Sequence, residues 1–74
     1  MAKADEQYDV RRELLGILMD KVHRDRYPSA TMMDLVEQLM GPDERSAYAQ
    51  VLIDKIRHDR RPSLDMMRRV MALA

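Results

Sequence analysis

The residues of this sequence that could carry chemistry are two histidines and their acidic neighbours. Asp20 and His23 stand three positions apart and would share one face of a helix, where an acid and a histidine can ligate one metal ion. His58 does not extend this pair, because Arg57 stands at the position that repeats His23. No further acid is placed to complete a ligand set. We therefore expect solvated histidines, and no metal or other cofactor.

The serines do not form a nucleophilic site with a histidine and an acid. Ser29 and Ser63 each follow a proline, and Ser46 lies near an expected helix start. The chain has no glycine-rich phosphate loop. A helical unit of this size also leaves little room for a substrate pocket. The sequence therefore predicts a protein that is not an enzyme.

A duplicated segment organises the chain. The pentapeptide DRYPS at 25–29 recurs 34 positions later as DRRPS at 59–63. Residues 18–40 align without a gap on residues 52–74, and 11 of the 23 paired positions are identical. A fixed period of this length is typical of a repeated supersecondary unit. Tetratricopeptide repeats have the same period, but their Trp, Leu-Gly, Tyr and Ala pattern is absent here.

Each copy of the pentapeptide predicts a turn between two helices. Proline disfavours the helical conformation of the residue before it, so a helix should end near Asp25 and another near Asp59. The serine after each proline is a preferred N-cap for the next helix. We expect the two aspartates to accept hydrogen bonds from backbone N–H groups at the turn, or to pair with the lysines four residues earlier. The residues assigned to turns and caps are Asp25, Pro28, Ser29, Asp59, Pro62 and Ser63.

The expected fold is all-α: a duplicated αα-hairpin with a long helix, a Pro-Ser turn and a short helix in each copy. Because a short helix covers only part of a long one, we expect the two long helices to pack together in a four-helix unit with pseudo-two-fold symmetry. The chain should be a single domain, 1–74, with repeat units at about 6–40 and 43–74. The expected helices begin near Asp5 or Glu6 and then span Ala30–Met40, Asp43–Asp59 and Leu64–Ala72.

Composition excludes several classes of protein. The 74 residues carry 13 basic and 13 acidic side chains and no cysteine, so neither a disulfide scaffold nor a cysteine zinc site is expected. No apolar run approaches the length of a membrane span, and the first residues lack the apolar core of a signal peptide. We therefore expect a cytoplasmic protein with no membrane partner.

DNA binding is the alternative function. Zero net charge speaks against it, but arginines gather around the last expected helix, which could act as the reader of a helix-turn-helix. The equivalent helix of the first copy carries Asp34 and Glu37, which would repel phosphate. These acids align with Arg68 and Met71 of the second copy. Such complementary charge would steer the two short helices together, or two chains head to tail.

Repeated methionine pairs offer a second candidate surface. Two adjacent methionines on a helix cannot both face one core line, so one of each pair is expected to stay partly exposed and available to a partner. The sequence thus predicts a small non-catalytic interaction or adaptor module, which binds a protein partner or a second copy as a homodimer. The residues assigned to the partner surface are Met33, Met67, Arg60, Arg61, Arg68 and Arg69.

Overall fold

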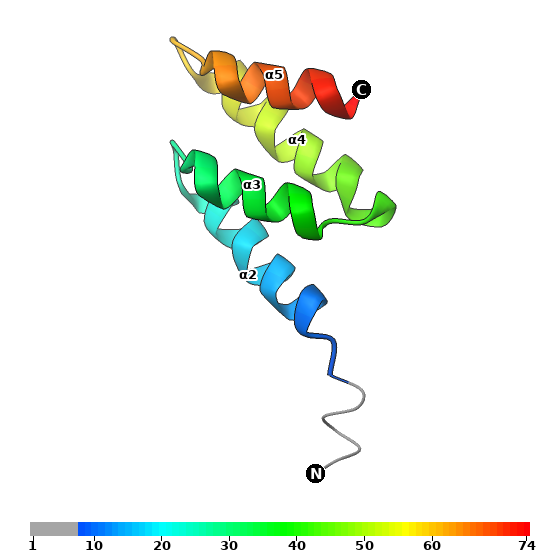
Figure 1. The fold of residues 1–74 in the computed structure, drawn as a ribbon. Helices are drawn as coiled ribbons and strands as arrows, with labels where there is room; N and C mark the ends of the chain where they lie inside the picture. Colours follow the sequence, from blue (N-terminus) through cyan, green and yellow to red (C-terminus); the bar gives the residue numbers. More distant parts are fainter. Residues whose placement is uncertain (1–7) are drawn as a thin grey trace.

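The computed structural model describes residues 8–74, whose ribbon is shown in Figure 1. This part of the chain is helical and contains no strand, so the all-α class predicted from the sequence is confirmed. The helices, labelled as in Figure 1, are α2 (Val10–Arg24), α3 (Ala30–Leu39), α4 (Pro42–His58) and α5 (Leu64–Leu73).

The two short helices begin at the serines that follow the prolines. Ser29 is the N-cap of α3, and its hydroxyl accepts a hydrogen bond of 3.1 Å from the backbone N–H of Met32. Ser63 caps α5 in the same way, accepting from Met66 at 3.1 Å. The caps satisfy N–H groups that have no partner within the helix.

The two long helices begin at different kinds of cap. The start expected near Asp5 or Glu6 lies outside the described residues; within them, α2 begins after Asp9, whose side chain accepts from the Arg12 N–H at 3.0 Å. At α4, the N-cap is Gly41, and its N–H donates to Glu44 Oε1 at 2.6 Å. This hydrogen bond lowers the pKa of the Glu44 carboxyl.

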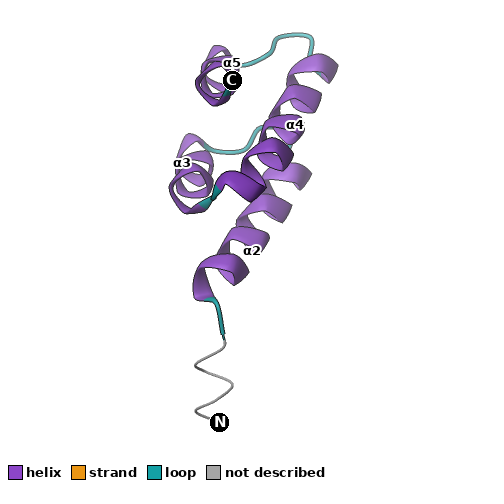
Figure 2. Ribbon diagram, turned by 90° about the vertical axis from the view of Figure 1, so that its right-hand side faces the viewer, coloured by secondary structure: helices purple, strands orange, loops and turns teal. Residues whose placement is uncertain are grey.

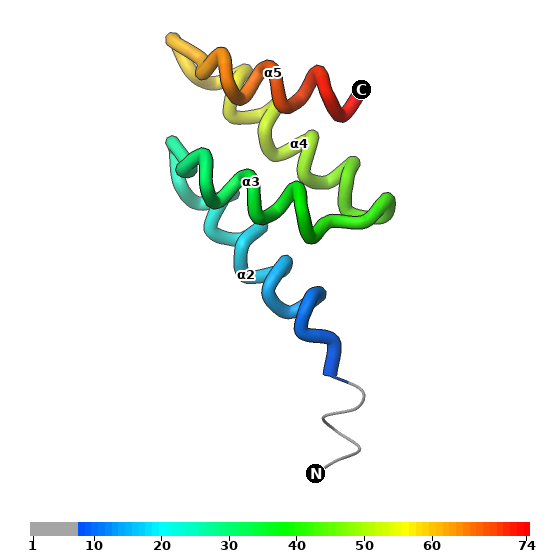
Figure 3. The backbone as a smooth tube through the Cα atoms, viewed as in Figure 1, coloured from blue at the N-terminus to red at the C-terminus, as the bar shows by residue number. Residues whose placement is uncertain are grey.

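The helices form two hairpins that stack on one another. Helix α3 packs against α2, α5 packs against α4, and α2 contacts α4. Figure 3 shows α2 and α4 running in the same direction, while α3 and α5 run back. In the view of Figure 2, α3 and α5 lie on one side and α2 and α4 on the other. The expected packing of the two long helices against each other is thus present.

The two copies are not related by the expected pseudo-two-fold symmetry. A pseudo-two-fold axis along the helices would place α3 and α5 on opposite sides of the long helices, but both lie on the same side, so the copies are related by a shift. The reason lies in the side chains. Arg69 on α5 binds Asp34 and Glu37 on α3, and these ion pairs hold the short helices on one face.

The core is concentrated where the two hairpins meet. Val22 and Val36 from the first hairpin and Tyr48 and Leu52 from the second are fully buried. Hydrophobic burial of this kind is the main favourable term in folding. The buried core consists of Leu15, Leu18, Val22, Met33, Val36, Tyr48, Leu52 and Met66.

Gly16 lies inside α2 with open space beside it. A Cβ atom added there would meet no other atom within 4 Å. Because glycine in a helix interior costs about 0.5–1 kcal/mol relative to alanine, we expect Gly16→Ala to raise the free energy of unfolding by that amount. Urea denaturation measures it. Gln50 occupies the equivalent position in α4, and Gln50→Gly should change stability in the opposite direction; a loss of stability in Gly16→Ala would contradict the assignment.

Candidate functional site

The two turn aspartates differ in their contacts. The Asp59 carboxylate accepts a hydrogen bond from the backbone N–H of Arg61 at 3.4 Å and one from the Tyr27 hydroxyl at 3.5 Å. For Asp25, no hydrogen bond to the carboxylate occurs within residues 8–74; its backbone carbonyl instead accepts a hydrogen bond from Lys55. Tyr27 stands where the second copy has Arg61, so the two turns are not chemically alike.

Lys55 joins the second hairpin to the end of α2. Its Nζ donates to the backbone carbonyl oxygens of His23 at 2.9 Å and of Asp25 at 2.5 Å. Carbonyls at the end of a helix lack partners and carry the negative end of the dipole, so a lysine is a favourable cap. Burial lowers the pKa of Lys55, and the nearby Asp25 and Asp54 oppose that change. Pairing with Asp59, one alternative that the sequence left open, is not seen within the described residues.

Removing this cap should destabilise the fold. We expect Lys55→Ala to lower the free energy of unfolding by about 1–2 kcal/mol, because two charge-assisted hydrogen bonds are lost. Lys21, at the repeat-equivalent position, is the matched control: it is exposed, and within the described chain its side chain makes no hydrogen bond or ion pair. Thermal and urea unfolding of both variants decide the matter, and equal effects would contradict the capping role of Lys55.

A polar network joins α3, α4 and α5. The hydroxyl of the fully buried Tyr48 donates to Glu37 Oε2 at 2.5 Å. The same carboxylate accepts from Arg69 Nη1, which also binds Asp34, both at 2.9 Å. Arg69 Nε donates to Asp65 at 2.8 Å. One guanidinium therefore binds three carboxylates on two helices.

The network shifts the pKa values of two of its members. Burial, and then the hydrogen bond to Glu37, raise the pKa of Tyr48 well above its usual value. For Arg69, burial alone would lower the pKa, but the hydrogen bonds that its guanidinium donates to Asp65, Glu37 and Asp34 outweigh it and raise the pKa. Both shifts favour the protonated form of the group.

Two residues assigned to the partner surface lie elsewhere. Met33 is only 3% exposed and belongs to a core that includes residues of both hairpins. The Arg69 side chain is only 12% exposed and is engaged by the acids described above. The sequence predicted the charge complementarity of the short helices but assigned it to the neighbouring Arg68.

The other assigned residues are accessible. Arg60, Arg61 and Arg68 are exposed, and Met67 is half-buried on α5. The arginines of the turn lie at one end of α5, and no ion pair to any of the three occurs within residues 8–74. These residues are free to meet an anionic or acidic partner.

The first hairpin leaves an apolar surface uncovered, which we call the N-terminal edge; it comprises Leu14, Ile17, Lys21 and Leu35. Leu14 is 43% and Leu35 41% exposed. Their counterparts in the second copy, Tyr48 and Arg69, are covered by the first hairpin. The edge is open because no hairpin precedes it within residues 8–74.

The second hairpin leaves the opposite surface uncovered, which we call the C-terminal edge; it comprises Ile56, Met67, Val70 and Met71. Met71 is 75% exposed. Ile56, Met67 and Val70 are partly buried, whereas their counterparts in the first copy lie in the core. This difference in burial arises because the second hairpin covers the first, and the described chain has no third hairpin to cover the second.

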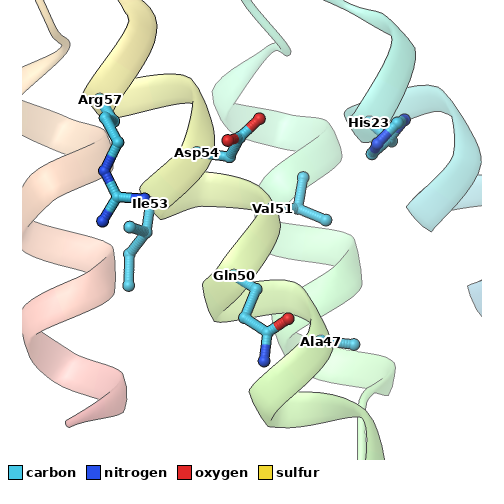
Figure 4. Close-up of a pocket in the computed structure, with 7 residues that line it drawn as sticks. All are labelled: His23, Ala47, Gln50, Val51, Ile53, Asp54 and Arg57. Atoms are coloured by element: carbon cyan, nitrogen blue, oxygen red, sulfur yellow. The ribbon is translucent and has the colours of Figure 1, made fainter.

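A hollow of about 630 Å³ lies along α4, next to the end of α2. Figure 4 shows that its side chains do not converge on one point. Of its polar groups, Asp54 pairs with His58 on its own helix, at 3.3 Å between Oδ1 and Nδ1, and His23 comes from α2. The hollow is lined by His23, Ala47, Gln50, Val51, Ile53, Asp54 and Arg57.

Residues 8–74 contain no group of three or more His, Cys, Asp or Glu side chains placed to hold a metal ion. Of the helices in this part of the chain, none is both long enough and apolar enough to cross a bilayer. No protein-family model, curated protein or solved structure matches the chain.

Lys55 and Tyr48 were not predicted from the sequence as residues that join the two copies, whereas Glu37 was among the acids expected to draw the short helices together. A signal for Lys55 was present, because lysine occupies positions 21 and 55 in both copies. For Tyr48 there was none, since its counterpart is Leu14. Residues that differ between copies are the ones that distinguish the inside of a stack from its ends.

Proposed function

We propose that this protein is a non-catalytic helical interaction module that binds another protein through the open edges of its repeat stack. The observation that carries the proposal is the asymmetry of burial. Leu14 and Leu35 are exposed where Tyr48 and Arg69 are covered, and Met71 is exposed where Glu37 is half-buried. Repeat proteins stack each unit on its neighbours, and apolar surface left at an end is available to a partner.

The DNA-binding alternative is favoured by one observation, the accessibility of Arg60, Arg61 and Arg68 beside the start of α5. It is weakened by the engagement of Arg69 with the acids of α3. Those acids belong to α3, which lies on the same side of the stack as α5 (Figure 2), and they would repel a phosphate backbone. We therefore place this function second.

The test compares substitutions of the edges with substitutions of the turn. Tagged protein is incubated with an extract of the source cells, and retained proteins are compared between wild type, Met71→Glu and Arg60→Ala/Arg61→Ala. We expect the edge substitution to lose a specific partner and the turn substitution to retain it. In parallel, generic duplex DNA is titrated at low salt. Saturable DNA binding that the turn substitution abolishes would replace the proposal by its alternative.

A further inference from the structure

We propose that the partner is a second copy of this chain, whose N-terminal edge packs on the C-terminal edge of the first in the register of the internal junction. This inference rests on the proposed function and names its partner. The internal junction is the contact between the two hairpins of one chain, and it serves as a template. Because the repeat is 34 residues long, each pair of residues in contact there has a corresponding pair between the second hairpin of one copy and the first hairpin of the next. Each corresponding pair can then be tested for chemical compatibility.

The internal junction contains a polar triad, and the three residues that correspond to it between two copies are apolar. Inside the chain, Glu37 contacts both Tyr48 and Arg69. One repeat further, the corresponding residues are Met71 of one copy and Leu14 and Leu35 of the next. All three have changed from polar to apolar together, and all three are exposed. A change of one alone would have left an unpaired polar group in the interface.

The lysine that caps a helix end at the internal junction corresponds to another lysine at the junction between copies. Lys55 donates to the backbone carbonyls of His23 and Asp25 at the end of α2. Lys21, its counterpart, is exposed in the single chain. In the stacked arrangement it reaches the carbonyls of Arg57 and Asp59 at the end of α4 of the other copy. These carbonyls lie at the corresponding end of α4, although the Asp59 N–H there bonds to Ile56, three residues back, whereas the Asp25 N–H bonds to Lys21, four residues back. Within residues 8–74, no lysine caps them.

The contact between the two turns becomes an ion pair. Inside the chain, the Tyr27 hydroxyl donates to the Asp59 carboxylate. The corresponding residues across the copies are Arg61 and Asp25, which have opposite charges. Asp25 is the turn aspartate whose carboxylate makes no hydrogen bond within residues 8–74. The contact between copies therefore joins two opposite charges, whereas the contact within the chain joins a neutral hydroxyl to a carboxylate.

The resulting interface joins two different surfaces, so it is heterologous. Two copies related by a shift do not close on themselves, and further copies can add at both ends. We expect sedimentation velocity of the wild type to show a mass that rises from the 8.7 kDa monomer past the dimer as concentration increases from micromolar to millimolar.

Edge substitutions test the register. Met71→Glu and Leu35→Arg each place a charge in the apolar triad and should each leave a monomer. Combining both substitutions in one chain recreates at each junction between copies the Glu37–Arg69 pair of the internal junction and should restore association. Lys21→Ala should weaken association about tenfold without unfolding the chain. The matched controls are Ala72→Glu and Gln38→Arg, exposed neighbours on the same helices, which should associate as the wild type does.

Each outcome decides between the possibilities. If only one of the two edge variants blocks association, an edge pairs with itself and the head-to-tail arrangement is wrong. If both block it but the chain that carries both substitutions stays monomeric, the proposed register is wrong. A wild type that is monomeric at every concentration overturns the inference; the proposed function survives that result only if Met71→Glu still loses a partner protein from the extract, and otherwise falls with it.

Discussion

Tyr48→Ala is expected to lower the free energy of unfolding by about 3–5 kcal/mol, the range for removing a large buried aromatic side chain. Tyr48 is fully buried at the junction of the two hairpins, and its loss leaves a cavity between α3 and α4. For a chain of 74 residues, this is a large part of the total stability. Circular dichroism during urea denaturation measures the change.

Two further variants separate packing from hydrogen bonding at Tyr48. Tyr48→Phe keeps the ring and loses only the hydrogen bond to Glu37, so its cost should be about 1 kcal/mol. Tyr8 lies before α2 and is exposed, so Tyr8→Ala should change stability by less than about 0.5 kcal/mol. A Tyr48→Ala variant as stable as Tyr8→Ala would refute the assigned core.

Arg69→Leu should have the second largest effect, lowering the free energy of unfolding by about 2–3 kcal/mol. The substitution leaves the carboxylates of Asp34, Glu37 and Asp65 close together with no cation between them. The value lies below that for a fully buried ion pair because two of these acids are about half exposed. Urea denaturation at neutral pH is the measurement.

The neighbouring Arg68 provides the control for Arg69. It is exposed, and within residues 8–74 it makes no ion pair, so Arg68→Leu should be close to neutral. Adding Glu37→Gln to Arg69→Leu should recover part of the loss, because one uncompensated charge is removed while the amide still accepts from Tyr48. Additive effects of the two substitutions would show that the guanidinium does not act through Glu37.

The local structure of this protein was predictable because its signals are short in range. Proline followed by serine ends one helix and caps the next through contacts within three residues. The same holds for Pro42 at the start of α4, which follows Gly41 directly. Such rules need no knowledge of what packs against the helix.

The candidate site was less predictable because its contacts join distant residues. Arg69 and Glu37 are 32 positions apart, and Lys55 and His23 are also 32 apart. Arg68 and Arg69 are both arginines on α5, and only the rotation of α5 against α3 decides which one meets the acids. Met33 was assigned to an exposed surface for the same reason, since the core to which it belongs includes residues of the second hairpin, later in the chain.

By itself, the sequence determined the helical class, the duplication and the turns, because helix ends and apolar periodicity depend on neighbours along the chain. Only the tertiary structure decided that the copies are related by a shift and that one edge of each hairpin stays open. That decision depends on Lys55, Tyr48 and Arg69, whose partners lie in the other hairpin. A side chain that bridges two repeats is recognisable only once the repeats are placed side by side.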